Sequence, residues 1–141
     1  MTFAPVIRTQ SDLERAWRTL MEPLGFSGHS VWLMFLGPDD RPLPQLTEIE
    51  DCVGVPDDEH LHGLAHVIEA VLTEVAPGGR VGFLRTRPGR DAVSADDRAW
   101  AAALHAACTI AGVRGDVVHV ANDVRLAPVP LDDLPLRRTA S

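Results

Sequence analysis

The sequence contains no lysine and no tyrosine, only two cysteines and no long apolar run, and each absence narrows what the chain can be. All thirteen basic residues are arginines, and twenty acidic residues outnumber them, which gives a formal net charge of -7. Because affinity for a phosphate backbone requires a basic surface, this balance argues against nucleic acid as a partner. The heavy use of Ala, Arg, Asp, Pro and Gly is typical of the coding bias of a GC-rich bacterium.

The scarcity of cysteine and of apolar runs bears on location. Cys52 and Cys108 stand alone, without a C-x-x-C spacing, and are expected to be buried thiols in a reducing compartment. The longest apolar run, residues 31–36, has the size of a strand and is far shorter than the ~18 residues of a membrane span. Residues 1–8 lack the basic-then-apolar pattern of a secretion signal. We therefore predict a cytoplasmic protein that does not enter a membrane.

Several catalytic motifs are also missing. The chain has no Gly-x-Ser-x-Gly elbow, no Gly-x-x-x-x-Gly-Lys loop and no Gly-x-Gly-x-x-Gly turn, so serine hydrolysis and nucleotide loops lack support. His105 precedes Cys108 by three positions, a helical spacing that indicates packing more often than a catalytic pair.

Periodicity and turn residues predict one α/β domain over residues 1–130 and a loose tail over 131–141. Ser11 and Glu14 have the spacing of a capping box at the start of the first helix, and two prolines, Pro42 and Pro44, indicate an edge strand or the start of a strand. The expected elements are helices over 11–22, 56–76 and 94–111, and strands over 29–36, 42–49, 80–86, 117–121 and 124–129. This order, α-β-β-α-β-α-β-β, fits a mixed sheet with flanking helices.

One segment carries a motif. Arg85-x-Arg87-Pro88 ends the third predicted strand, and Ser94-x-x-Asp97 opens the last predicted helix. The segment resembles the metal-site segment of the JAB/MPN (JAMM) family, in particular its bacterial RadC-type branch. There the pattern is His-x-His-Pro-Ser-Gly, a short loop, and Pro-Ser-x-x-Asp at a helix start. The resemblance covers about residues 28–127, implies an MPN/cytidine-deaminase-like sandwich, and leaves the helix over 11–22 as an addition.

The resemblance implies a pseudo-enzyme. In the family two histidines and the aspartate hold Zn²⁺, but here Arg85 and Arg87 stand at the histidine positions. A guanidinium stays protonated and has no lone pair to offer a metal. The resemblance thus implies no cofactor, no catalytic residue, and a binding or scaffold role as a homodimer or with a protein partner.

The family's general base, a glutamate on an earlier strand, would fall near residues 45–46. No glutamate stands there, but Glu48 and Glu50 lie slightly further along. Either one is a candidate remnant of the catalytic glutamate.

The motif residues have simpler interpretations too. Ser94 and Asp97 have the spacing of a capping box. Arg85 and Arg87 are expected either to end a strand in solvent, to pair with Asp97 in place of the metal, or to form an anion pocket with Arg90 at the helix start.

A second constellation supports an alternative function. His62 and His66 are four positions apart on a predicted helix, a spacing that can chelate a transition metal. A metal-dependent hydrolase that uses these histidines is therefore one alternative, although no H-E-x-x-H motif supplies a base between them. A binder of small anions or nucleotides at Arg85, Arg87 and Arg90 is the other. Surface histidines are the simpler interpretation.

Overall fold

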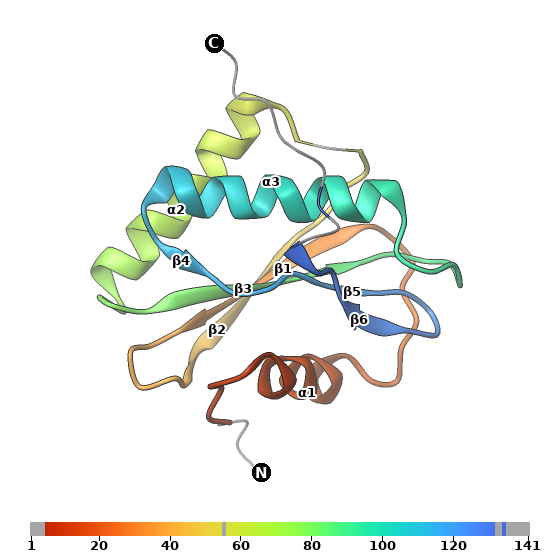
Figure 1. Cartoon of the computed structure of the whole chain (residues 1–141), viewed down its shortest axis with the longest axis horizontal. Helices are drawn as coiled ribbons and strands as arrows, with labels where there is room; N and C mark the ends of the chain where they lie inside the picture. Colours follow the sequence, from red (N-terminus) through yellow and green to blue (C-terminus); the bar gives the residue numbers. More distant parts are fainter. Residues whose placement is uncertain (1–4, 55, 132–133, 135–141) are drawn as a thin grey trace.

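A computed structural model describes residues 5–54, 56–131 and 134 of the chain. Within these residues the chain forms three helices and six strands (Figure 1). In chain order they are α1 (Gln10–Met21), β1 (Ser30–Leu36), β2 (Pro42–Ile49), α2 (Asp58–Glu74), β3 (Arg80–Thr86), α3 (Ala95–Ala111), β4 (Arg114–Gly115), β5 (His119–Ala121) and β6 (Leu126–Pro128).

The strands form one mixed sheet in the order β2-β1-β3-β5-β6, with β4 beside β3. β1 runs antiparallel to both of its neighbours, β4 and β5 run parallel to β3, and β6 returns antiparallel to β5. α1 covers one face of the sheet, and α2 and α3 cover the other (Figure 1). The predicted α/β class with a mixed sheet and flanking helices is thereby confirmed.

Each face of the sheet has its own apolar core, because side chains alternate between the two faces of a strand. On the α2/α3 side, Leu33 and Phe83 of the central strands are fully buried. On the α1 side, Leu36 and Leu84 pack with Trp17 of α1, which is 0% exposed. The N-terminal helix, expected as an addition, therefore closes the core on one face of the sheet.

The helices begin at side-chain caps, which satisfy backbone N–H groups that the first turn leaves free. α1 is capped by Thr9 with Asp12, so the prediction of Ser11 as the cap was wrong. Asp57 caps α2, and Ser94 caps α3 together with Asp97. None of these described helices has both the length and the apolar character that a membrane crossing requires.

The strands differ from the prediction mainly in length. β2 is an edge strand, as Pro42 and Pro44 predicted. The closing hairpin exists, but β5 and β6 are each shorter than expected, and β4 was not predicted. The tail predicted over 131–141 lies, apart from Leu131 and Leu134, outside the described residues. Cys52 and Cys108 are free and buried, as predicted.

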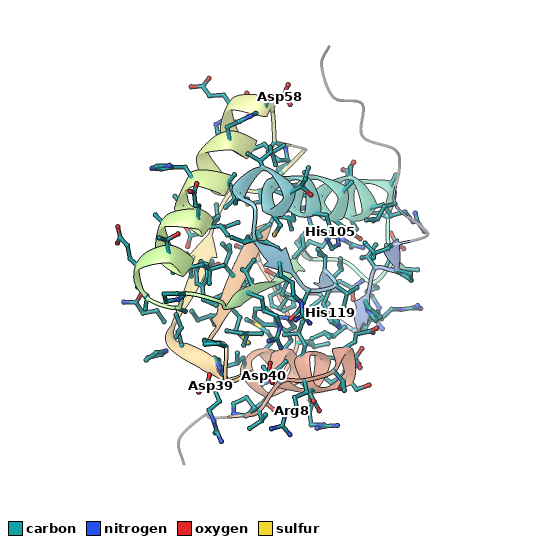
Figure 2. All side chains as sticks on the ribbon, turned by 60° about the vertical axis from the view of Figure 1, so that its left-hand side comes forward. Arg8, Asp39, Asp40, Asp58, His105 and His119 are labelled. Carbon is teal, nitrogen blue, oxygen red and sulfur yellow. The ribbon has the colours of Figure 1, made fainter. Side chains whose placement is uncertain are left out.

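A buried arginine at the start of β3 joins three loops. Arg80 Nε lies 2.9 Å from Asp116 and its Nη1 lies 2.7 Å from Asp40, while Nη2 donates to the carbonyl of Ile7. Burial lowers the pKa of Arg80, but its bonds to Asp116 and Asp40 outweigh burial, and the pKa is raised. Figure 2 shows Asp40 beside the N-terminal end of α1, near Arg8. This network fixes the end of the sheet opposite the motif.

Candidate functional site

The end of β3 directs Arg85 toward the α2/α3 side of the sheet. Arg85 pairs with Val31 on β1 and Val120 on β5, and both valines belong to the core beneath α2 and α3. Thr86 points the other way, where its hydroxyl accepts a hydrogen bond of 3.1 Å from Trp32 Nε1. The alternation of side chains along β3 thus places the guanidinium group of Arg85 in the apolar core beneath α2 and α3.

Asp97 in the first turn of α3 is the common partner of both arginines. Arg85 Nη1 donates to Asp97 Oδ1. Arg87 Nε lies 2.9 Å from the same oxygen, and Arg87 Nη2 lies 2.7 Å from Oδ2. Asp97 is 0% exposed, Arg85 1% and Arg87 8%. The predicted alternative in which an arginine pairs with Asp97 is therefore present, and both arginines take part.

Ser94 joins the same cluster through the backbone. Its hydroxyl accepts from the N–H of Asp97 at 3.1 Å, and its own N–H donates to Asp97 Oδ2 at 2.9 Å. This reciprocal pair is the predicted capping box. One carboxylate therefore caps α3 and pairs with both arginines, so the capping and ion-pair interpretations hold together.

The cluster holds more positive than negative charge. Burial raises the pKa of Asp97, but hydrogen bonds from Arg87, Ser94 and Arg85 outweigh burial, so the pKa lies below the usual 3.8. The hydrogen bond to Asp97 raises the pKa of Arg87 further above its already high ordinary value. With two guanidinium groups and one carboxylate, the buried residues of the cluster carry a net charge of +1, and exposed Asp91 acts on Arg87 from outside the cluster.

Two neighbours of Arg85 were missed by sequence reasoning. The Trp100 ring lies 6.0 Å from the guanidinium carbon, a cation–π distance, and the carbonyl of Cys52 accepts from Nη2 at 3.4 Å. Arg85 Nε has no hydrogen-bond partner within the part of the chain that the structure describes. The spacing of Asp97 and Trp100, three apart on a helix, was the available signal for Trp100. Nothing in the sequence marked Cys52.

These residues do not fit the zinc ion that the resemblance would place here. Arg85 and Arg87 offer no lone pair, and both oxygens of Asp97 already accept hydrogen bonds from them. A dication at this position would also meet two guanidinium groups at close range. The arrangement instead suits a permanent ion-pair cluster between β3 and α3.

The arginines are also not arranged as an open anion pocket. The guanidinium groups of Arg85 and Arg87 turn inward to Asp97, while Arg90 is exposed in the following loop. Arg87 Nη2 also donates a hydrogen bond of 3.2 Å to the carbonyl oxygen of Ala92. The three cations named as a possible anion site therefore do not converge.

Glu48 lies on the wrong face to be a remnant of a general base for this site. It stands directly across from Trp32 in the β1–β2 register, on the face away from Arg85. The residue in the same row as Arg85, through Val31, is Ile49. Glu50 follows β2 and is exposed.

His62 and His66 both lie on the exposed side of α2. His62 Nδ1 is 2.8 Å from the carbonyl oxygen of Asp58, one turn earlier. Among residues 5–54, 56–131 and 134, no three His, Cys, Asp or Glu side chains are grouped as a metal site requires. The helix therefore brings the two histidines together as predicted but supplies no third ligand.

Comparison of the chain with family models, with curated proteins and with solved structures found no match.

Proposed function

We propose that this chain is a non-catalytic member of the MPN/RadC-like group that acts by binding. The observation that supports it most is the convergence of Arg85, Arg87 and Asp97 at one buried point. These are the three positions at which the resemblance places metal ligands. The proposal is that the scaffold has kept the geometry of the three positions and replaced the metal's positive charge with guanidinium groups.

The sheet topology gives secondary support. A strand pair, a crossing helix, the motif strand, a further helix and closing strands follow one another, which is the order the resemblance implies for an MPN/cytidine-deaminase-like sandwich. Likeness of fold is a weak guide to function, so the weight rests on the cluster. The free, buried thiols of Cys52 and Cys108 fit a reducing compartment, and we propose the cytoplasm as the location.

Metal analysis of natively purified protein tests the alternative of a metal-dependent hydrolase. We expect less than stoichiometric zinc, nickel or manganese, and no gain of thermal stability when zinc is added. The variant His62→Ala/His66→Ala serves as the comparison. A bound metal that this variant loses, together with hydrolysis that chelation abolishes, would establish the metal-dependent hydrolase instead.

Restoring histidine tests the resemblance itself. In the double variant Arg85→His/Arg87→His, two imidazoles and Asp97 would form a three-ligand set for zinc. We expect zinc to raise the melting temperature of this variant and not that of the matched control Arg85→Gln/Arg87→Gln. If both variants are folded by circular dichroism and zinc affects neither, the ligand positions are not those of the family.

The kind of partner is tested by sedimentation of the full chain over a range of concentrations. A mass that rises to twice that of the chain identifies a second copy as the partner. A constant monomer mass excludes a second copy and leaves a different protein as the proposed partner.

A further inference from the structure

A cavity of about 370 Å³ opens on the α1 side of the sheet, on the face opposite the arginine cluster. One wall is the loop of residues 25–29, which includes Phe26 and His29. The other wall is the sheet, where Ser30, Trp32, Glu48 and Thr86 line the cavity, and Glu50 and Asp51 follow at the end of β2. The volume lies in the range of small-ligand sites.

The strand register explains why these side chains meet. Trp32 on β1 is directly opposite Glu48 on β2, and Ser30 is directly opposite Thr86 on β3. Residues 30 and 32 are two apart, so all four side chains share one face. Ser30 donates to Glu48 Oε2 at 2.8 Å, and Trp32 Nε1 donates to Thr86. The carboxylate and the indole are thereby held side by side.

The lining is acidic, and His29 is the one basic side chain in it. Glu48, Glu50 and Asp51 contribute three carboxylates, and no arginine lines the cavity. Across the described ranges 5–54, 56–131 and 134, none of the ion pairs involves these three residues. The cavity therefore presents negative charge against an aromatic wall, an arrangement that attracts cations.

Three exposed carboxylates alone would form an ordinary solvated surface, but the cavity has further features. Thr86, which is 2% exposed, lines the cavity. One lone pair of its hydroxyl oxygen accepts the hydrogen bond from Trp32 Nε1. A second lone pair of Thr86 is free to accept from a ligand N–H. The carboxylates are too dispersed for a metal ion, since no metal-like group of three occurs among the described residues. A larger cation with several N–H donors fits better.

We propose that this cavity binds a guanidinium or ammonium group carried on a short apolar chain. Glu48 and Thr86 accept hydrogen bonds from the group, Trp32 and Phe26 contact its apolar chain, and Glu50 and Asp51 attract it to the opening. None of the residues of the arginine cluster takes part in this binding. A failure to bind the cation would therefore not contradict the function proposed above.

Agmatine and N-acetyl-arginine amide are suitable probes, titrated against the full chain while Trp32 is followed by fluorescence and by its indole N–H signal. Trp17 and Trp100 are buried, and the variant Trp32→Phe assigns the response. Agmatine carries a guanidinium at one end and an ammonium at the other, so its tighter binding identifies a free small-molecule dication as the ligand, whereas tighter binding of the blocked amide identifies an arginine side chain of a protein segment. The neutral analogue N-acetyl-citrulline amide should not bind.

Glu48→Gln keeps the shape of the side chain and should weaken binding about tenfold, the usual scale for a charge-assisted hydrogen bond. Asp51 has a positive φ of 58°, a conformation that asparagine tolerates, so Asp51→Asn should weaken binding without strain. Glu69→Gln, exposed on α2, is the matched control. Equal affinity in Glu48→Gln and Glu69→Gln, equal binding of the citrulline analogue, or no response of Trp32 to either probe would overturn the proposal.

Discussion

Arg85 and Asp97 form a buried ion pair between the end of β3 and the first turn of α3, with side chains 2% and 0% exposed. Both would be costly to bury alone, because a charge loses its hydration when it leaves water. Together with Arg87 they replace that hydration with hydrogen bonds. The pair therefore fixes α3 on the sheet and fills the place where a metal would be expected from the sequence motif.

Asp97→Asn should be strongly destabilising. The substitution leaves two buried guanidinium groups without a carboxylate, a situation that typically costs about 3–5 kcal/mol. Since the pKa of Asp97 is lowered on folding, its stabilising effect is present above the ordinary value of 3.8 and is lost as the pH falls through the lowered pKa. Urea unfolding at neutral pH measures the loss, and Ser94→Ala, which removes only the cap at about 1 kcal/mol, is the control. A loss below about 1 kcal/mol for Asp97→Asn would contradict the assigned role.

Arg85→Met should be much milder. Asp97 keeps three hydrogen bonds from Arg87, and the variant removes the positive charge beside Trp100. Replacing a buried charge by an apolar side chain of similar length is often nearly neutral. We expect a change within about 1 kcal/mol in the same urea experiment. A loss of unfolding free energy as large as that of Asp97→Asn would mean that Arg85 alone accounts for the stabilising effect of the cluster.

Stability should also fall between about pH 6.5 and pH 4 because of His119. Figure 2 shows this residue between the sheet and α1. Burial lowers its pKa from 6.5 to about 4, although Glu14, whose carboxylate is 3.9 Å from Nε2, acts in the opposite direction. The unfolded chain therefore takes up a proton at a higher pH than the folded chain, and stability is complete above the unfolded pKa. The loss on acidification should be about 3 kcal/mol.

The control for this pH effect is His119→Leu, which should flatten the slope over the same pH range. Burial also lowers the pKa of His105, so His105 adds a slope of the same sign in both proteins. The difference between the two urea unfolding series isolates His119. Parallel slopes in variant and wild type would show that His119 is not the titrating group.

Two glycine substitutions should have opposite effects. Gly63 lies within α2, and a Cβ there meets nothing within 4 Å, so Gly63→Ala should stabilise the protein by about 0.5–1 kcal/mol through helix propensity. At Gly79 a Cβ would lie 2.2 Å from the carbonyl oxygen of Leu36, so Gly79→Ala should destabilise it by about 2–3 kcal/mol. Paired thermal melts measure both. The same sign for both variants would contradict the packing at the start of β3.

Helix positions were largely predictable from the sequence, but their exact starts were not. Thr9-x-x-Asp12 and Ser11-x-x-Glu14 both have the spacing of a capping box, and only the packed helix selects Thr9. β4 was not predictable because two residues have no periodicity. It exists because Gly115, whose Cβ would lie 2.7 Å from Cys108 Sγ, lets the chain pass close to α3.

The arginine cluster was partly predictable, since Arg85, Arg87 and Asp97 lie close together in the sequence. The face occupied by Glu48 was not, because it depends on the register between β1 and β2. That register contains an irregularity between Met34 and Leu36, which hydrophobic alternation does not reveal. The cavity beside Trp32 depends on the same register and was missed for the same reason.

The alternation of β3 has a consequence for how this sequence can change over generations. Arg85 and Thr86 are adjacent in the chain, yet their side chains lie on opposite sides of the sheet. Mutations that erase a reactive centre on one side need not disturb the hollow on the other. Substitutions can therefore change the site on the Arg85 face of this seven-residue strand while the cavity on the Thr86 face is kept.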